Sequence, residues 1–295
     1  MIDLRQYIPK SIKKLYKGIT MAPKRKYLVG NYEIDLPANF SLPEYQKKFK
    51  LYDRFLPVLV HEFSSGSTII DIGANIGDTA IAMLATCKSK IVCVEPSDIF
   101  FPYLQKNLSY LTVEDKERVT TIKAFIGTGE ISGTLDHFES TASIKVDRNV
   151  NTVSYVPLDN LTAGIQDVIL IKTDTDGFDF DVIKSAIKTL GSSEPILFWE
   201  NEISEDFQLK GFTELYSLLT QNSYNHIYIF DNFGNLISEE TNFDSLKNIN
   251  DYIYSMKKNN TARTIYYTDI MASTKKNHQA VNSAINRYRE EWIKK

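Results

Sequence analysis

Short apolar runs alternate with helical patterns from about residue 67 to residue 230 of the chain. The runs are continuous rather than alternating, which is typical of parallel strands buried on both faces, and the stretches between them have the apolar spacing of amphipathic helices. The pattern therefore predicts an α/β protein with a doubly wound, mostly parallel sheet. Strands are expected within residues 68–73, 90–96, 118–127, 167–174, 195–200, 226–231 and 263–273, and helices from about residue 78, near 99–111, at 179–190 and near 212–220.

The remaining segments depart from this pattern. Residues 27–66 begin like a strand or hairpin arm and continue as helices broken by prolines, which predicts a preamble or lid. A stretch rich in Gly, Ser and Thr at about residues 128–156 predicts a β insertion. The main domain is then expected to span residues 67–276, followed by a polar C-terminal helix at 277–295.

Composition and charge restrict the class of protein. The chain has 295 residues, of which 43% are hydrophobic, and a net charge of −3, so a dense basic face for nucleic acid is not expected. No apolar stretch approaches the ~18 residues of a membrane span. Cys87 and Cys93 fall in segments expected to be core, and no apolar signal segment opens the chain, which predicts a cytoplasmic setting.

Residues 1–26 form a distinct basic segment with eight lysines and arginines against one acid, Asp3. Its apolar residues recur at three- and four-residue steps, so a basic amphipathic helix could rest on the inner face of an anionic membrane or on an acidic partner. The alternative is an ordinary helix packed on the domain. It is favoured because Pro9 interrupts the pattern.

The turn IDIGANIGD follows the first strand of the main domain. In this architecture ligands bind beyond the carboxyl ends of the strands, and the turn after the first strand makes most of the contacts with the ligand. Glycines there permit a close approach of a ligand to the main chain, and asparagine tolerates the left-handed region better than most residues. A small polar ligand is therefore expected, held by Asp71, Gly73, Ala74, Asn75 and Gly77.

A dinucleotide fits this turn poorly. Its fingerprint G-x-G-x-x-G requires glycine where this chain has Asn75, and Asp78 at the helix start would repel a pyrophosphate. S-adenosylmethionine has no phosphate and carries a sulfonium cation, so acids at Asp71 and Asp78 suit it. Glu95, with Pro96 beside it, ends the next strand, where its carboxylate can accept both ribose hydroxyls. The alternative is that Asp71 caps the helix and Glu95 is solvated.

A second group of polar residues follows the fourth strand, in DVILIKTDTDGFDFD, and the next strand ends in Glu200. Neighbouring strand ends should bring Lys172, Asp174, Asp176 and Glu200 to one cleft floor, with the lysine partly neutralising its neighbour. An alcohol acceptor needs a base within about 3 Å, for which the three acids qualify. Binding of Mg²⁺ by these acids, or capping of the next helix, are the alternatives.

The segments IIDIGANIGDTA, VCVEPSDIFFPYLQKNL, VPLDNL, DVILIKTDTDGFDFDVIKSA and PILFWENE resemble the FkbM-type S-adenosylmethionine-dependent methyltransferases, over about residues 27–202. The resemblance implies a class I methyltransferase (Rossmann-like) fold, with a seven-stranded sheet whose last strand is antiparallel. It also implies methylation of a hydroxyl, often of a sugar in a surface glycan or glycolipid precursor. The turn after the first strand, Glu95 and the K-x-D-x-E-G element at Lys172 to Gly177 match the family's motifs, except that Asp176 stands where glutamate is usual.

Two other functions remain open. Asp174-Thr175-Asp176 imitates the D-x-D motif of metal-dependent nucleotide-sugar glycosyltransferases, and a non-catalytic binder of S-adenosylmethionine would need the same turn. Phe125, expected at the end of the third strand, is a candidate for contact with the adenine, with core packing as the alternative. The four histidines show no ligand-like spacing and are interpreted as ordinary surface or core residues rather than zinc ligands: His61, His137, His226 and His278.

Overall fold

The computed structural model describes residues 25–129, 133–138, 141–146, 154–262 and 265–294. Its central sheet contains eight strands: β3 (Thr68–Ile72), β4 (Lys90–Val94), β5 (Val119–Ile122), β10 (Val168–Thr173), β11 (Ile196–Asn201), β12 (His226–Asp231), β13 (Leu236–Thr241) and β14 (Thr268–Ser273).

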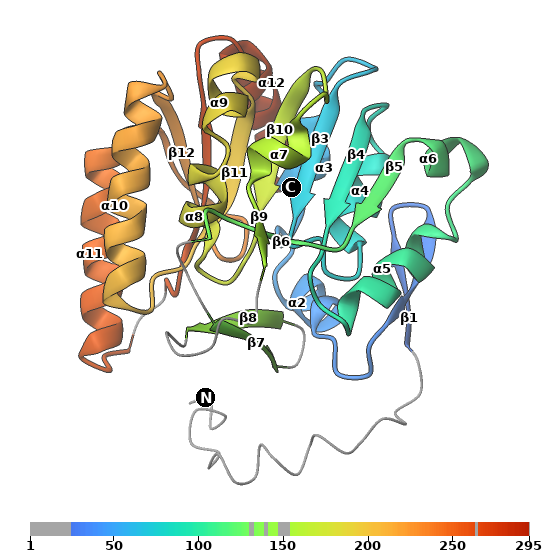
Figure 1. The fold of residues 1–295 in the computed structure, drawn as a ribbon, viewed down its shortest axis with the longest axis horizontal. Coiled ribbons are helices and arrows are strands. Elements are labelled where there is room, and N and C mark those ends of the chain that lie inside the picture. Colours follow the sequence, from blue (N-terminus) through green and yellow to red (C-terminus); the bar gives the residue numbers. More distant parts are fainter. Residues whose placement is uncertain (1–24, 130–132, 139–140, 147–153, 263–264, 295) are drawn as a thin grey trace, which may run out of the picture.

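The strand order across this sheet is β13-β12-β14-β11-β10-β3-β4-β5 (Figure 1). The strands from β5 to β11 pair in parallel, whereas β14 runs antiparallel to both of its neighbours. The predicted doubly wound, mostly parallel sheet is confirmed, with β14 as its antiparallel last strand. Strand β13, which pairs antiparallel with β12 at the sheet edge, is one strand more than the sequence predicted.

Successive residues of the central strands enter different hydrophobic clusters, so both faces of the sheet are covered. Ile69 belongs to one cluster and Ile70 to the other, and Leu170 and Ile171 divide in the same way. One cluster includes residues of α3 (Phe55–Val60), α4 (Asp78–Leu84), α5 (Phe100–Leu108) and α12 (His278–Tyr288). The other includes residues of α8 (Asp179–Lys184), α9 (Ile187–Ser193), α10 (Asp206–Gln221) and α11 (Phe243–Lys258).

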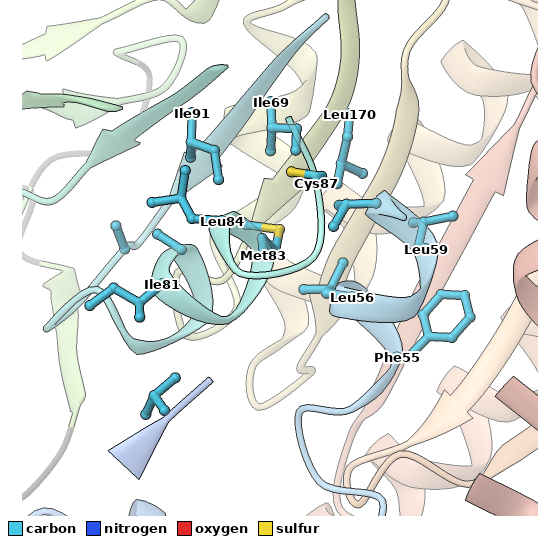
Figure 2. Close-up of a cluster of buried hydrophobic side chains, with 14 of the residues drawn as sticks. Phe55, Leu56, Leu59, Ile69, Ile81, Met83, Leu84, Cys87, Ile91 and Leu170 are labelled. Atoms are coloured by element: carbon cyan, nitrogen blue, oxygen red, sulfur yellow. The ribbon is translucent and has the colours of Figure 1, made fainter. Parts of the chain in front are cut away.

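Figure 2 shows how the first cluster fixes the start of the main domain. Leu56 and Leu59 of α3 and Met83 and Leu84 of α4 converge on Ile69 and Leu170 of the sheet. Full burial of an aliphatic side chain contributes roughly 1.5–3 kcal/mol. The helix that follows the first turn is therefore held firmly against the strand that precedes it.

Residues 27–66 contain the predicted hairpin and helices, but prolines do not break these helices, because Pro43 and Pro57 lie in the first turns of the two helices. Strands β1 (Arg25–Val29) and β2 (Tyr32–Leu36) pair antiparallel, and α2 (Leu42–Lys48) precedes α3. The Asn107 side chain donates hydrogen bonds to the carbonyl oxygens of Asp35 and Ile76, at 3.0 and 2.9 Å. It thereby joins the hairpin to the turn after β3.

The predicted β insertion contains an antiparallel hairpin, β7 (Gly133–Phe138) and β8 (Thr141–Val146), which lies below the edge of the main sheet in Figure 1. A short parallel pair, β6 (Phe125–Ile126) and β9 (Tyr155–Val156), flanks it in the sequence. Smaller helical segments are α6 (Val113–Glu117), α7 (Leu158–Thr162) and η3 (Arg289–Ile293).

Residues 1–24 lie outside the described residues, and with them most of the basic segment. Its predicted helix and its contact with a membrane therefore stay predictions, as does the division of the chain into domains. Within the described ranges, no helix has the length and the apolar character needed to cross a membrane.

Candidate functional site

A cleft opens at the carboxyl ends of the parallel strands and contains about 1250 Å³ of space, part of it open to solvent. Ten of the twelve predicted site residues line it: Gly73, Ala74, Asn75, Glu95, Pro96, Phe125, Lys172, Asp174, Asp176 and Glu200. Asp71 and Gly77 do not. The predicted residues therefore share one cleft, because the carboxyl ends of parallel strands lie on the same side of the sheet.

The turn after β3 is shaped by close packing. Gly73 and Gly77 have φ of +73° and +86°, and Asn75 between them has φ of +49°. A Cβ atom on Gly73 would lie 1.9 Å from the carbonyl oxygen of Asp174, and one on Gly77 would lie 2.8 Å from Leu104 Cδ1. Glycine at position 73 lets the ends of β3 and β10 meet, while Gly77 lets α4 begin against α5.

Glu95 is buried rather than solvated at the end of β4. Its two carboxylate oxygens accept hydrogen bonds from the backbone N–H groups of Asn75 and Ser97, both at 2.8 Å. Burial raises the pKa of Glu95, and these two hydrogen bonds oppose the shift. Each carboxylate oxygen has a second lone pair, so a residue that lines the cleft in this way can accept further hydrogen bonds from a ligand.

Asp78 occupies the amino-terminal end of α4. Burial raises its pKa to about 6, and the nearby backbone N–H groups of Asp78 and Thr79 oppose this shift. A helix start is the usual binding place for a phosphate group because its N–H groups are free and its dipole is positive. Here the acidic Asp78 occupies the first turn of the helix, and its negative charge when ionised disfavours a pyrophosphate.

Asp71 lies beneath the cleft floor, fully buried, with its Oδ1 atom 3.1 Å from Lys172 Nζ. The same ammonium group lies 3.6 Å from Asp174 Oδ2 and donates a hydrogen bond to the carbonyl oxygen of Gly73 at 3.2 Å. Burial alone would lower the pKa of Lys172, but Asp71 and Asp174 raise it. Lys172 is therefore a cation held by protein groups at the centre of the site.

An acidic cluster lies at the ends of β10 and β11, formed by Asp176, Glu200 and Glu202. One carboxylate oxygen of each lies within 4.8 Å of the other two. Burial, with the nearby charges of Asp174 and Glu202, raises the pKa of Asp176 to about 8, and burial also raises that of Glu200. Glu200 Oε2 is buried without a hydrogen-bond partner among the described residues.

Other acids that follow β10 serve the protein scaffold. Asp179, the first residue of α8, accepts hydrogen bonds from the N–H and the hydroxyl of Thr175 in the preceding turn. It does not cap the helix, because the N-cap residue is Phe178 and no side chain among the described residues caps α8, so the capping alternative is wrong for Asp179. Asp181 accepts two hydrogen bonds from Thr128, which fixes the end of β6. Neither Asp179 nor Asp181 lines the cleft, so the cleft chemistry rests on Asp174, Asp176 and Glu200.

Several cleft residues from outside the main strand ends were not predicted from the sequence, among them Tyr52, Asp53 and Tyr267. Burial in the cleft wall and the charges of Asp78 and Asp174 raise the pKa of Asp53 to about 8. More than a third of the surface of Asp53 is nevertheless accessible, so the neighbouring charges are the firmer cause. Asp53 adopts φ of +59° between α2 and α3, and no local motif identifies it.

Phe125 lines the cleft but does not belong to the third strand of the main sheet. That strand, β5, ends at Ile122, and Phe125 begins β6, which pairs with β9 instead. Its ring lies edge-on to that of Tyr155, with centroids 6.1 Å apart. The side chain thus reaches the cleft from the base of the β insertion, and its contact with adenine stays a prediction.

Comparison with solved structures gives several similar folds at low sequence identity. The FkbM methyltransferase from Methylobacillus flagellatus KT has a TM-score of 0.38 and 14% identity, covering 79% of this chain and 58% of that one. An O-methyltransferase from Bacillus cereus in complex with SAH has a TM-score of 0.45 and 13% identity, and the match covers 90% of this chain and 97% of that chain. The precorrin-6Y C5,15-methyltransferase from Geobacter metallireducens GS-15 has a TM-score of 0.38 and 11% identity, with 74% and 85% covered.

The chain matches no curated protein. It does match the model of the methyltransferase FkbM domain over residues 71–227, which is more than half of its length. This range begins in β3 and ends in β12, so it contains most strand ends that form the cleft. The strand order and this match together confirm the predicted class I methyltransferase fold. The chain belongs to the FkbM methyltransferase family.

Proposed function

We propose that this protein transfers a methyl group from S-adenosylmethionine to a hydroxyl oxygen of a sugar, in a surface glycan or glycolipid precursor. The observation that carries the choice of donor is the charge of the cleft lining. Its carboxylates are Asp53, Asp78, Glu95, Asp174, Asp176 and Glu200, and among the described residues Lys172 is its only basic side chain. A cleft of this charge attracts a cationic ligand.

The residues present fit S-adenosylmethionine better than a phosphorylated cofactor. Glu95 has free lone pairs at the end of β4 for the ribose hydroxyls, and Phe125 offers a ring for the adenine. Asp53 and Asp78 line the cleft near the turn, and a bound sulfonium or ammonium group would favour their ionised forms, against the raised pKa values of the ligand-free protein. When bound, this cofactor supplies a methyl group already activated by a positive sulfur, so the chain has chiefly to align donor and acceptor.

The acceptor hydroxyl must lose its proton as it attacks. Asp176 and Glu200 lie together at the far side of the cleft, and the raised pKa of Asp176 makes it a stronger base than an ordinary aspartate once it is ionised. Tyr52 and Tyr267 line the same cleft and offer amphipathic rings for a sugar. We therefore assign Asp176 or Glu200 as the general base. Mg²⁺ at the acidic cluster stays a prediction.

Methyl transfer is tested by incubating the full chain with methyl-labelled S-adenosylmethionine and glycans or glycolipids from cells that lack the gene. The expected result is a labelled methyl ether at a sugar oxygen and a mass increase of one CH2 unit on a single sugar, because the methyl group replaces the hydroxyl proton. Parallel reactions with EDTA or added Mg²⁺ test the metal. Binding of S-adenosylmethionine without transfer to any glycan acceptor would favour a non-catalytic binder. Binding of a UDP-sugar with Mn²⁺ instead would favour the glycosyltransferase.

A further inference from the structure

Two histidines and a glutamate from different elements meet at the end of the sheet that is opposite the cleft. His226 is the first residue of β12, Glu240 lies in β13, and His278 is the first residue of α12. Strand β12 runs in the same direction as β11, so its first residue lies at the amino ends of the parallel strands, whereas the cleft lies at their carboxyl ends. We call these three residues the His-Glu cluster.

The side chains of this cluster are already grouped. Glu240 places Oε2 2.8 Å from His226 Nδ1 and Oε1 2.6 Å from His278 Nε2. The imidazole rings stack with centroids 3.7 Å apart and an interplanar angle of 16°. One ligand atom from each residue lies within 4.8 Å of the other two, and all three side chains remain partly accessible to solvent.

From this arrangement we propose that His226, Glu240 and His278 bind a divalent transition-metal ion of the zinc class, with water completing the coordination. Two imidazole nitrogens and one carboxylate oxygen are a ligand set that Zn²⁺ takes in proteins, with bonds of about 2.0–2.2 Å. A tetrahedral ion with such bonds separates its ligand atoms by about 3.3 Å. The observed contacts of 2.8 and 2.6 Å are shorter than this, so binding requires Glu240 to withdraw, and it requires the stacked imidazole rings to turn until their lone pairs converge on the ion. All three side chains are partly exposed, which leaves room for these movements.

Neighbouring groups hold the ligands in place. The Tyr228 hydroxyl donates a hydrogen bond to Glu240 Oε1 and lies 2.7 Å from Asn282 Oδ1. The amide of Asn282 in turn lies 2.9 Å from His278 Nε2, one helical turn along α12. Tyr228 therefore orients Glu240, whereas the ion would replace the contact of Asn282 with His278 Nε2. The bound ion would join β12, β13 and α12, which are separated by up to 52 positions in the sequence (278 − 226).

Glu240 is the negatively charged member of the cluster. Burial alone would raise the pKa of Glu240. Hydrogen bonds from Tyr228, His226 and His278 nevertheless lower it to about 2. The carboxylate is therefore ionised across the physiological range. Two stacked rings that both carried a proton would repel each other, whereas a metal ion would supply the positive charge and leave both imidazoles neutral.

The test uses the full chain, stripped of metal with EDTA and then dialysed. We expect calorimetry at neutral pH to show one-to-one binding of Zn²⁺ with a Kd in the micromolar range or tighter. Co²⁺ should produce visible absorption bands of a four-coordinate site, and both ions should raise the melting temperature.

Variants separate this cluster from the other acids and histidines. Glu240→Gln and His278→Ala should each weaken Zn²⁺ binding at least about tenfold. His61→Ala should not change Zn²⁺ binding, because the ion pair that His61 makes among the described residues is with Glu62. Asp176→Asn should also leave it unchanged. The proposal would be overturned if the unaltered chain gave neither a heat of Zn²⁺ binding nor the cobalt absorption bands. It would also be overturned if Asp176→Asn lost Zn²⁺ binding while Glu240→Gln kept it.

Discussion

Lys172 and Asp71 are partners on the adjacent parallel strands β10 and β3, and their charged groups lie 3.1 Å apart in the interior. The two side chains are 6% and 0% exposed. An ion pair at this depth gains little from its own attraction after desolvation, but loss of one partner leaves an uncompensated charge. The pair therefore fixes the strand ends below the cleft, and Lys172 acts as a positioning residue for the Gly73 carbonyl and for Asp174.

Replacement of one charge in this pair should destabilise the fold strongly. Lys172→Met leaves Asp71 buried without its cation, so the free energy of unfolding, measured in urea, should fall by about 3–5 kcal/mol. The control is Lys184→Met, which breaks a partly exposed pair with Glu214 and should cost no more than about 1 kcal/mol. If both variants lost the same free energy of unfolding, the buried pair would contribute no more to stability than the partly exposed pair.

Gly73 should tolerate no side chain. In Gly73→Ala the new Cβ would lie 1.9 Å from a backbone oxygen, and the residue would keep a positive φ, so we expect a loss of about 2–5 kcal/mol. Gly66→Ala is the matched control, because Gly66 also has a positive φ (+97°) but nothing lies within 4 Å of its Cβ position. It should lose about 1–2 kcal/mol. A Gly73 variant as stable as this control would contradict the close approach of β3 and β10.

The methylation rate should rise with pH if Asp176 is the base. Its pKa in the folded protein is about 8, so only the ionised fraction is active below that pH, and kcat/KM should increase toward pH 8 and then level off. Asp176→Asn should lower kcat by roughly 10²–10⁴, while Asp176→Glu restores the family's usual residue and should keep more activity. A flat pH profile with an active Asn variant would assign the base to Glu200 or to none of these acids.

Asp53 should reduce the stability of the ligand-free protein as pH rises. Its pKa is raised from 3.8 to about 8 in the folded state, so between these values the folded state binds more protons than the unfolded state. Stability therefore falls with increasing pH across this window. Asp53→Asn should melt at a higher temperature than the unaltered chain at pH 8, with a smaller difference near pH 4. Asp244→Asn, at a carboxylate 90% exposed, should show no such trend.

Much of this site was predictable from sequence because its chemistry lies at strand ends. Continuous apolar runs located β3, β4, β10 and β11, and a parallel sheet brings the residues after them to one edge. The contact between Lys172 and Asp71 was not predictable, because it depends on the register between two strands about 100 positions apart. Asp53 was missed for a related reason, since its place in the cleft depends on how α2 and α3 pack.

The C-terminal part was predicted less well. Strand β13 has the sequence LISEET, which carries few apolar residues because it lies at the sheet edge. Helix α11 did have a signal that was not used: Phe243, Leu246, Asn250 and Ile253 are buried at helical spacing after the N-cap residue Asn242. The meeting of His226 with His278 had no local signal, since the two residues lie in different elements.

The most direct test of the central claim is calorimetric titration of the full chain with S-adenosylmethionine and, separately, with NAD⁺ and with a UDP-sugar plus Mn²⁺. The account predicts one-to-one binding of S-adenosylmethionine alone. It also predicts affinity weakened by about 1–3 kcal/mol in Glu95→Gln, which loses charge-assisted hydrogen bonds to ribose, and unchanged in Glu114→Gln, at an exposed acid paired with Lys88. Binding of either diphosphate ligand without binding of S-adenosylmethionine would contradict it.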